Sequence, residues 1–161
     1  MNEMFERILS LRVSDVMASE PVTVDASASM ADVSQLFASQ GLHSAPVVDP
    51  SGRCIGIITS SDFVKRNEVY SVANGQPHEI ARHEAGIEVE PRSYDYVSQC
   101  MTQGVQGVMP STALIAAARI MTDAHLHVLP VIENNLPVGI LSNLDVVAAL
   151  VNAFEEARNA I

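Results

Sequence analysis

A seven-residue stretch that occurs twice constrains this chain more than any other feature of its sequence. One copy, residues 56–62, reads Gly-Ile-Ile-Thr-Ser-Ser-Asp, and the other, residues 139–145, reads Gly-Ile-Leu-Ser-Asn-Leu-Asp. Each copy begins as an apolar strand and ends in polar residues that are typical of a helix start. A strand that runs into a helix N-terminus directs unpaired backbone N–H groups and the positive end of the helix dipole at one point, which favours an anion there.

The residues around these stretches repeat as well. Met17, His43 and Pro46 each recur 84 residues later, and the offset falls to 83 for the two stretches because the second copy has a shorter turn before its last strand. Residues 13–64 and 97–147 are therefore two copies of one unit of about 50 residues. Units of that size bury little core alone, so we expect them to pack together as one globule.

The polar residues that end each stretch suit a nucleotide. The hydroxyl of Thr59 or Ser142, at the strand end, is placed to contact a phosphate, and the carboxylate of Asp62 or Asp145 lies in the first helical turn. A carboxylate accepts hydrogen bonds only, so it favours the two hydroxyls of a ribose and repels a phosphate. The alternative is that Thr59 and Ser60 only cap the helix and that the acid only compensates its dipole. Two matching copies argue against that alternative.

Apolar patterns predict the same order of elements in both units: strand, helix, strand, strand, helix. The strands are expected at residues 22–24, 44–48, 54–59, 106–108, 127–132 and 137–142. The helices are expected at residues 3–11, 27–41, 61–70, 110–124 and 143–158. The two equivalent histidines, His43 and His127, are interpreted as strand-start positions more readily than as ligand contacts.

Composition and charge exclude several classes of function. The formal net charge is −10 with only nine Lys plus Arg, which argues against a nucleic acid polymer or an anionic membrane as partner. No apolar run reaches the roughly 18 residues that span a bilayer, and the N-terminus lacks a signal-peptide pattern, so we expect a cytoplasmic protein. Cys54 and Cys100 lack metal-ligand spacing and are expected to be buried and reduced. His78 and His83 are five residues apart, which does not suit a zinc pair on one helix face.

Each unit resembles a cystathionine-β-synthase (CBS) domain, and the tandem resembles the pair called a Bateman module. The resemblance rests on residues 13–17, 22–24, 45–49 and 56–62 in the first unit and on residues 97–102, 129–132 and 139–145 in the second. It implies an α+β fold of two β-α-β-β-α repeats packed about a pseudo-two-fold axis as one globule. The expected division is an N-terminal helix at residues 1–12, a first CBS domain at 13–70, a linker at 71–95, and a second CBS domain with an extended C-terminal helix at 96–161.

The resemblance also implies a ligand, because CBS pairs bind adenosine compounds in two clefts between their sheets. AMP or ATP is expected, with S-adenosylmethionine or NAD as alternatives. Mapped onto this sequence, Asp62 and Asp145 match the ribose-binding acid, and Thr59 and Ser142 match the phosphate-side hydroxyl. The remaining positions that the resemblance places in the clefts are Thr23, Ser44, Ala45, Pro46, Ser60, Ser61, Val128, Leu129, Pro130 and Asn143. The additional hydroxyls of the first unit favour the cleft that contains Asp62 if only one is occupied.

No catalytic constellation is found: there is no nucleophile with a placed base, no metal-ligand spacing and no Walker-type phosphate loop. An enzyme is therefore not expected, and neither a metal nor a required cofactor. Because the repeats fill this chain, the resemblance implies a regulatory module that signals to a separate protein, and it implies a homodimer. The alternative is a structural or protein-interaction module whose clefts do not bind a ligand.

Overall fold

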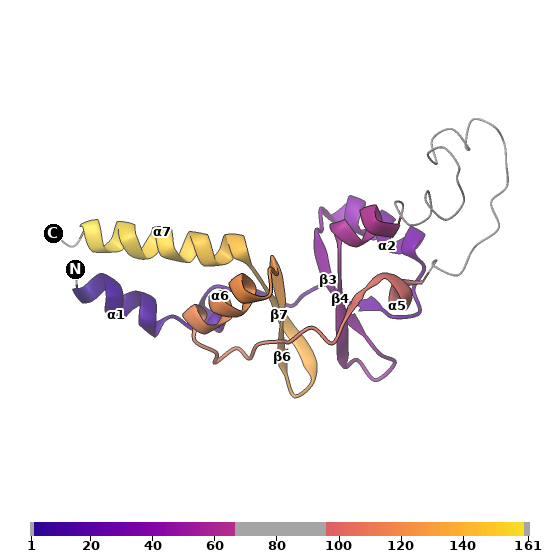
Figure 1. Cartoon of the computed structure of the whole chain (residues 1–161), viewed down its shortest axis with the longest axis horizontal. Helices are drawn as coiled ribbons and strands as arrows, with labels where there is room; N and C mark the ends of the chain where they lie inside the picture. Colours follow the sequence, from indigo (N-terminus) through magenta and orange to yellow (C-terminus); the bar gives the residue numbers. More distant parts are fainter. Residues whose placement is uncertain (1, 67–95, 160–161) are drawn as a thin grey trace.

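The computed structural model describes residues 2–66 and 96–159, and two sets of elements lie in the same order along these two parts (Figure 1). The first part contains α1 (Asn2–Ser10), a short 3-10 helix (Val13–Asp15), β1 (Ala18–Ser19), β2 (Val24–Asp25), α2 (Met30–Gln40), β3 (Ser44–Val48), β4 (Cys54–Thr59) and a helix that begins at residue 60. The second part contains α5 (Val97–Cys100), β5 (Thr102–Gln103), α6 (Leu114–Asp123), β6 (Val128–Glu133), β7 (Leu136–Ser142) and α7 (Asn143–Asn159). The predicted α+β class and the duplication are confirmed.

Most of the predicted elements are found within two residues of their predicted bounds, because their end signals are local. Ser29 is the N-cap of α2, and its hydroxyl accepts a hydrogen bond from the Asp32 N–H at 3.0 Å. Gly41 ends the same helix in the left-handed conformation, with φ of 64°. The second unit departs from the prediction at its first long helix, α6, which begins at Leu114 rather than at residue 110. There the Thr112 hydroxyl accepts from the Met109 N–H instead of capping the helix.

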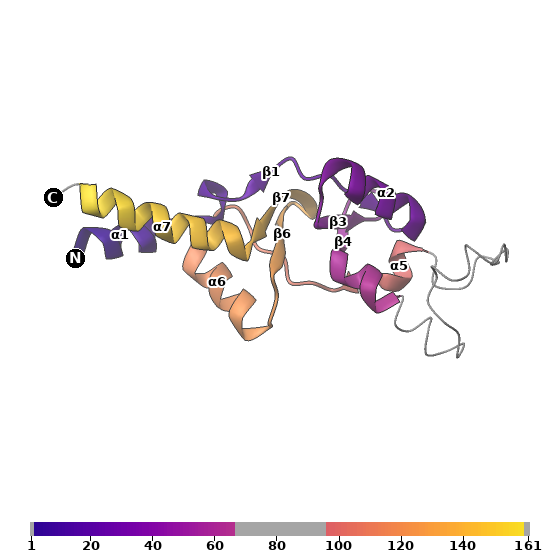
Figure 2. The same ribbon diagram turned by 90° about the horizontal axis from the view of Figure 1, so that it is seen from above.

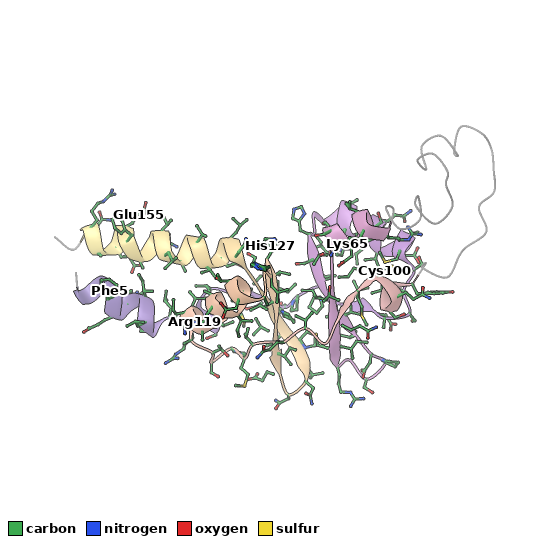
Figure 3. All side chains as sticks on the ribbon, viewed as in Figure 1. Phe5, Lys65, Cys100, Arg119, His127 and Glu155 are labelled. Carbon is green, nitrogen blue, oxygen red and sulfur yellow. The ribbon has the colours of Figure 1, made fainter. Side chains whose placement is uncertain are left out.

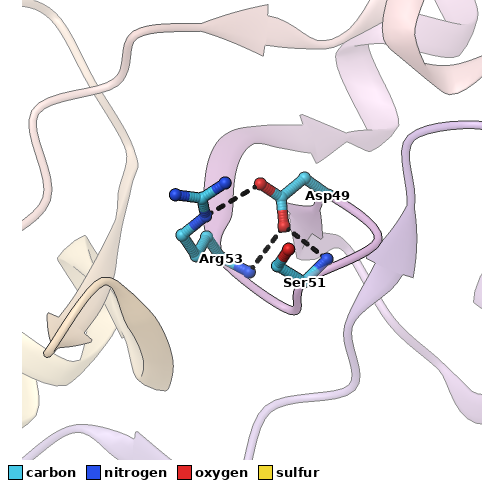
Figure 4. Close-up of polar contacts among 3 residues, drawn as sticks. All are labelled: Asp49, Ser51 and Arg53. Carbon is cyan, nitrogen blue, oxygen red and sulfur yellow. Dashed lines mark hydrogen bonds and ion pairs between the residues drawn. The ribbon is translucent and has the colours of Figure 1, made fainter.

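Different chemistry closes the two hairpins. In the first, the Asp49 carboxylate accepts hydrogen bonds from the N–H groups of Ser51 and Arg53 at 2.8 and 3.0 Å, and the Arg53 Nε donates to it at 3.0 Å (Figure 4). In the second, Asn134 and Asn135 turn the chain with φ of 52° and 65°, a conformation that asparagine tolerates in tight hairpins. The second turn is therefore shorter, which explains the change of offset between the two copies.

The two sheets exchange their first strands. One sheet has the order β2-β3-β4-β5 and the other the order β1-β7-β6. Strand β1 of the first unit pairs with β7 of the second, and β5 of the second unit pairs with β4 of the first. These two pairings are equivalent under the repeat, so the exchange obeys the pseudo-two-fold relation. The predicted strand at residues 106–108 is reduced to a single bridge between Val108 and Val131.

The exchange explains why each duplicated stretch begins with glycine. A Cβ on Gly56 would lie 2.6 Å from the Thr102 carbonyl oxygen, and a Cβ on Gly139 would lie 2.7 Å from the Met17 sulfur. Such distances are shorter than carbon contacts allow, so a side chain at either position would displace the exchanged strand or the methionine beside it. Figures 1 and 2 show the resulting arrangement, with the two hairpins next to each other and α1 packed along α7 at one end.

Two hydrophobic clusters form the core, and each contains the start of the other unit. Val13 is fully buried in the cluster of the second unit, with Leu129 and Leu141, and Val97 is fully buried in the cluster of the first, with Ile58. Each packed half therefore consists of one sequence repeat without its first residues, completed by the first residues of the other repeat. Their interlocking agrees with the expectation of one globule.

Cys54 and Cys100 are not joined in a disulfide, and each is half-buried rather than buried as predicted. Burial raises the pKa of the Cys54 thiol. The predicted linker at residues 71–95, with His78 and His83, lies outside the described residues. No described helix is long and apolar enough to cross a bilayer.

Candidate functional site

The first candidate site lies where β4 ends and the next helix begins. We call it the Asp62 site, and it comprises Ser44, Thr59, Ser60, Ser61 and Asp62. Thr59 precedes the helix, and its backbone N–H and its hydroxyl donate to Asp62 Oδ2 at 2.8 and 3.0 Å. The Asp62 residue is only 5% exposed, and its other oxygen, Oδ1, lies 3.9 Å from the Lys65 ammonium. This buried acid is therefore bonded on one oxygen and loosely ion-paired on the other.

The equivalent group in the second unit is the Asp145 site, which comprises Val128, Ser142, Asn143, Leu144 and Asp145. The Ser142 N–H and hydroxyl both donate to Asp145 Oδ2 at 2.7 Å. The Asp145 N–H donates back to the Ser142 hydroxyl at 3.2 Å, which completes a reciprocal capping box. Asp145 is only half-buried.

Capping is thus one role of these residues in both units, as the alternative interpretation of the sequence proposed. Capping does not exclude a ligand, because each acid uses Oδ2 for its cap and a carboxylate has a second oxygen with its own acceptor positions. The hydroxyls of Thr59 and Ser142 are engaged with the acids, so a phosphate contact would require them to rotate.

The sheet register brings the strand starts to the same place. Ser44 lies opposite Thr59, and Val128 lies opposite Ser142. The first helical N–H of each site is held by the residue before the strand: Ser60 donates to the His43 carbonyl at 3.0 Å, and Asn143 donates to the His127 carbonyl at 2.9 Å. Both histidine side chains are exposed, so the described contacts of these residues are made by the backbone.

Other predicted residues have different surroundings. The buried residues Ala45, Pro46, Leu129 and Pro130 lie within β3 and β6, so they contribute to the core at these positions. Thr23 is exposed and precedes β2, whose Val24 pairs with Val47, three residues along β3 from Ser44. The structure therefore places Ser44 beside Thr59 and Val128 beside Ser142, each pair at the end of its own hairpin, and leaves Thr23 at a neighbouring strand.

An open apolar groove of about 390 Å³ lies beside the Asp62 site, between α2 and the helix that begins at residue 60. Phe37 and Phe63 line it with their rings in edge-to-face contact at 5.5 Å, and His43 and Ser60 lie at its border. The groove shares Ser60 with the Asp62 site, but Asp62 and Thr59 do not line it. The sequence analysis did not predict this groove, although the helical spacing of Phe37 with Val33 marked that face as apolar.

Two segments of the chain, residues 13–68 and 97–152, match the family model of the CBS domain. The chain belongs to the CBS domain family. Each matched segment contains one duplicated stretch and one capped acid. The recognition of two CBS repeats from the sequence is thereby confirmed.

Relatives of this CBS pair include proteins of very different length. An uncharacterised protein of Methanocaldococcus jannaschii is 28% identical over 154 residues, which cover 86% of this chain and 90% of that protein. An inosine-5′-monophosphate dehydrogenase of Helicobacter pylori is 30% identical over 138 residues, which cover 85% of this chain but only 27% of the enzyme. The chain thus spans about a quarter of that enzyme and nearly all of the archaeal protein.

Solved structures of CBS pairs share the fold. The structure of CBSX2 of Arabidopsis thaliana in complex with AMP is 23% identical, with a TM-score of 0.68 and coverage of 89% of this chain and 98% of that one. The CBS pair of protein MJ0100, in complex with 5′-methylthioadenosine and S-adenosylmethionine, is 20% identical, with a TM-score of 0.66 and coverage of 86% and 98%. At these identities the comparison establishes the architecture of the pair.

Proposed function

We propose that this CBS pair is a regulatory module that binds an adenosine-containing ligand at the Asp62 and Asp145 sites and signals to a separate protein. The observation that carries the proposal is the duplicated carboxylate, fixed by a cap through one oxygen at the junction of a strand and a helix. A carboxylate held in this way is preorganised to accept hydrogen bonds from ribose hydroxyls, because its orientation is already set. The AMP, methylthioadenosine and S-adenosylmethionine of the structural neighbours support this ligand class.

AMP or ATP is the ligand we propose first, with S-adenosylmethionine and NAD as further candidates. The helix N-terminus beside Asp62 favours a phosphate, and the exposed Ser61 hydroxyl adds a donor at this site. The Ser60 hydroxyl donates to the His43 carbonyl at 3.3 Å and would have to turn to reach a ligand. We propose neither a catalytic role nor a metal for this module.

A homodimer, a regulated partner protein and a cytoplasmic location complete the proposal. Several large apolar side chains of α7 are exposed on the face away from the core, among them Val147, Val151 and Phe154. A second copy of the chain would bury them. A ligand would then act by binding one arrangement of the repeats better than another.

The second candidate function is that of a protein-interaction module whose sites bind no ligand. The engagement of the Thr59 and Ser142 hydroxyls in caps favours it, and so does the apolar groove lined by Phe37 and Phe63. A ligand titration separates the two functions.

Thermal unfolding in the presence of AMP, ADP, ATP, NAD or S-adenosylmethionine tests the proposal. A ligand at about 100 times its Kd adds about 2.7 kcal/mol and raises the Tm by roughly 5–10 °C. Asp62→Asn and Asp145→Asn are expected to abolish the shift at their own sites. Asp123→Asn, which changes an exposed acid at the end of α6, serves as the matched control. The absence of any shift with all five compounds would leave the interaction module as the better function.

A further inference from the structure

The two sites differ in charge although their backbones are equivalent. Counting 83 residues from the first unit, Lys65 corresponds to Ala148 and Arg66 corresponds to Ala149. The helix that follows Asp62 therefore carries two cations in its second turn, and α7 carries none at the same positions.

The contacts of the acids reflect this difference. The Lys65 ammonium lies 3.9 Å from Asp62 Oδ1, and its side chain is 71% exposed, so it can also turn toward a ligand. Within residues 2–66 and 96–159, the ion pairs that form include none with Asp145. Among the described residues, the Asp145 carboxylate is therefore not ion-paired with a basic side chain.

Two other described basic side chains are held in ion pairs of their own. Arg7 pairs with Glu156 at 3.3 Å, and Arg53 pairs with Asp49 in the first hairpin turn. Figure 3 shows Lys65 and His127 on the same side of the molecule and Arg119 lower on α6, away from His127. Arg119 is exposed and does not compensate Asp145 in this arrangement.

The residues next to the two acids also differ in polarity. Next to Asp62 stands the exposed Ser61, whereas next to Asp145 stands Leu144, which is 73% exposed. In the second site the Ser142 hydroxyl also takes up the Asp145 N–H, and no corresponding bond to the Asp62 N–H is found in the described part of the first. The first site therefore offers an anion the Ser61 hydroxyl and the Lys65 ammonium. The second offers the exposed Asn143 amide and an apolar contact with Leu144, beside a carboxylate that no described basic side chain pairs.

We infer that the two sites take adenosine compounds of different charge. The Asp62 site binds a 5′-phosphorylated adenosine, and the Asp145 site binds an adenosine derivative whose 5′ group is uncharged or cationic, such as a thioether or a sulfonium. A phosphate placed beside an uncompensated carboxylate is repelled, whereas a nearby ammonium offsets that repulsion. The inference rests on the proposed function and names the ligand class of each site.

Isothermal titration with AMP and with 5′-methylthioadenosine tests it, because the two compounds share adenosine and differ in the 5′ group. In Asp145→Asn, which leaves the Asp62 site intact, AMP is expected to bind more tightly than methylthioadenosine. In Asp62→Asn the order is expected to reverse. The same order of affinities in both variants would overturn the inference.

A reciprocal exchange of side chains provides the matched control. Lys65→Ala is expected to lower the ratio of AMP to methylthioadenosine affinity at the Asp62 site by about two- to fivefold, the range for one exposed charge pair. Ala148→Lys is expected to raise the same ratio at the Asp145 site by a similar factor. Both effects should shrink as the salt concentration rises from roughly 50 mM to 500 mM.

Two outcomes separate this inference from the proposed function. If neither compound binds to the wild-type chain, the proposed function fails, and the inference fails with it. If both compounds bind and the ratio is unchanged by Lys65→Ala and by Ala148→Lys, the proposed function stands and only the sorting by charge is wrong. The Tm of each variant without ligand confirms that the fold is retained.

Discussion

The two CBS repeats share a backbone plan but use different side chains at equivalent positions. In the first, the acid of the duplicated stretch is buried beside a lysine, the first long helix is capped by a serine, and an aspartate closes the hairpin. In the second, the acid is half-buried in a complete capping box, the corresponding helix lacks a side-chain cap, and two asparagines close the hairpin. The comparison teaches that the duplication preserves the backbone junctions and leaves the local chemistry free to diverge.

The largest effect is expected where the backbone plan itself is changed, at the glycines that open the duplicated stretches. Gly56→Ala places a Cβ 2.6 Å from the backbone carbonyl of Thr102, which cannot move without disturbing β5. We expect a loss of about 3 kcal/mol in the free energy of unfolding, at the upper end for overpacking. Gly139→Ala meets the Met17 sulfur at 2.7 Å, which can move, and the Ala18 carbonyl oxygen only at 3.0 Å, so it is expected to cost about 1–2 kcal/mol.

Urea denaturation of both variants checks this order. The two substitutions add the same atom at equivalent positions, so each is the control for the other. A greater loss for Gly139→Ala would mean that the exchanged strands do not pack as the structure shows.

The second comparison concerns the capped acids. Asp62→Ala leaves the Thr59 N–H without its acceptor in a part-buried place, and we expect a loss of about 2 kcal/mol. Asp145→Ala removes a similar pair of bonds, but Asp145 is more exposed and water can replace it, so about 1 kcal/mol is expected. Chemical denaturation without ligand measures both, and equal losses would show that burial does not distinguish the two caps.

A third comparison exchanges a helix cap. Ser29 caps α2, and its equivalent 84 residues later is Ala113, the N-cap of α6, which makes no side-chain cap hydrogen bond. Ser29→Ala is expected to lower the free energy of unfolding by about 1 kcal/mol, and Ala113→Ser to raise it by up to about 1 kcal/mol. Thermal and urea unfolding test both. A destabilising Ala113→Ser would show that α6 does not accept the cap that α2 uses, although both N-caps form equivalent β-bridges, Arg12–Ala113 and Ser29–Tyr96.

Local signals explain how much of this fold the sequence could predict. Ser29 and Gly41 mark the ends of α2, and the apolar runs of β3 and β4 match their observed bounds, because each signal acts within a few residues. The exchange of β1 and β5 was not predicted. Strands of two residues have no periodicity, and a repeat offset cannot distinguish pairing within a unit from pairing between units. The sequence carried one sign of the exchange. Met17 recurs as Met101 and Gly56 as Gly139, and in the structure each methionine lies against the glycine of the other unit.

The candidate sites could also be predicted where their contacts are local, and could not where they depend on the packing of distant segments. Thr59 and Asp62 lie within one helical turn, so their contact follows from the sequence, and so does that of Ser142 with Asp145. The sequence could not distinguish a cap from a ligand site, because one spacing serves both and each cap uses only one oxygen of the carboxylate. The difference in burial between Asp62 and Asp145 depends on the packing of whole repeats and required the structure.

The smallest effect is expected in the dependence of stability on pH, and it sharpens the comparison of the two hairpin turns. The N–H of Arg53 bonds to the Asp49 carboxylate and, with the Ser51 N–H and the Arg53 guanidinium, holds the pKa of Asp49 below its ordinary value of 3.8, although burial opposes the shift. A depressed pKa contributes stability that is present above the ordinary value and is lost as the pH falls through the lowered one. The second turn, at Asn134 and Asn135, has no such acid.

Asp49→Asn should therefore flatten the decline of Tm between about pH 5 and about pH 2, because the variant has no carboxylate to protonate at this turn. The effect is small, since the turn is open to solvent and salt screens it. Thermal unfolding at several pH values compares the wild type with Asn134→Asp, which places an acid in the second turn. If Asp49→Asn retains the full wild-type decline, the carboxylate network of the first turn contributes nothing to the stability of the pair, and the two turns are equivalent despite their different chemistry.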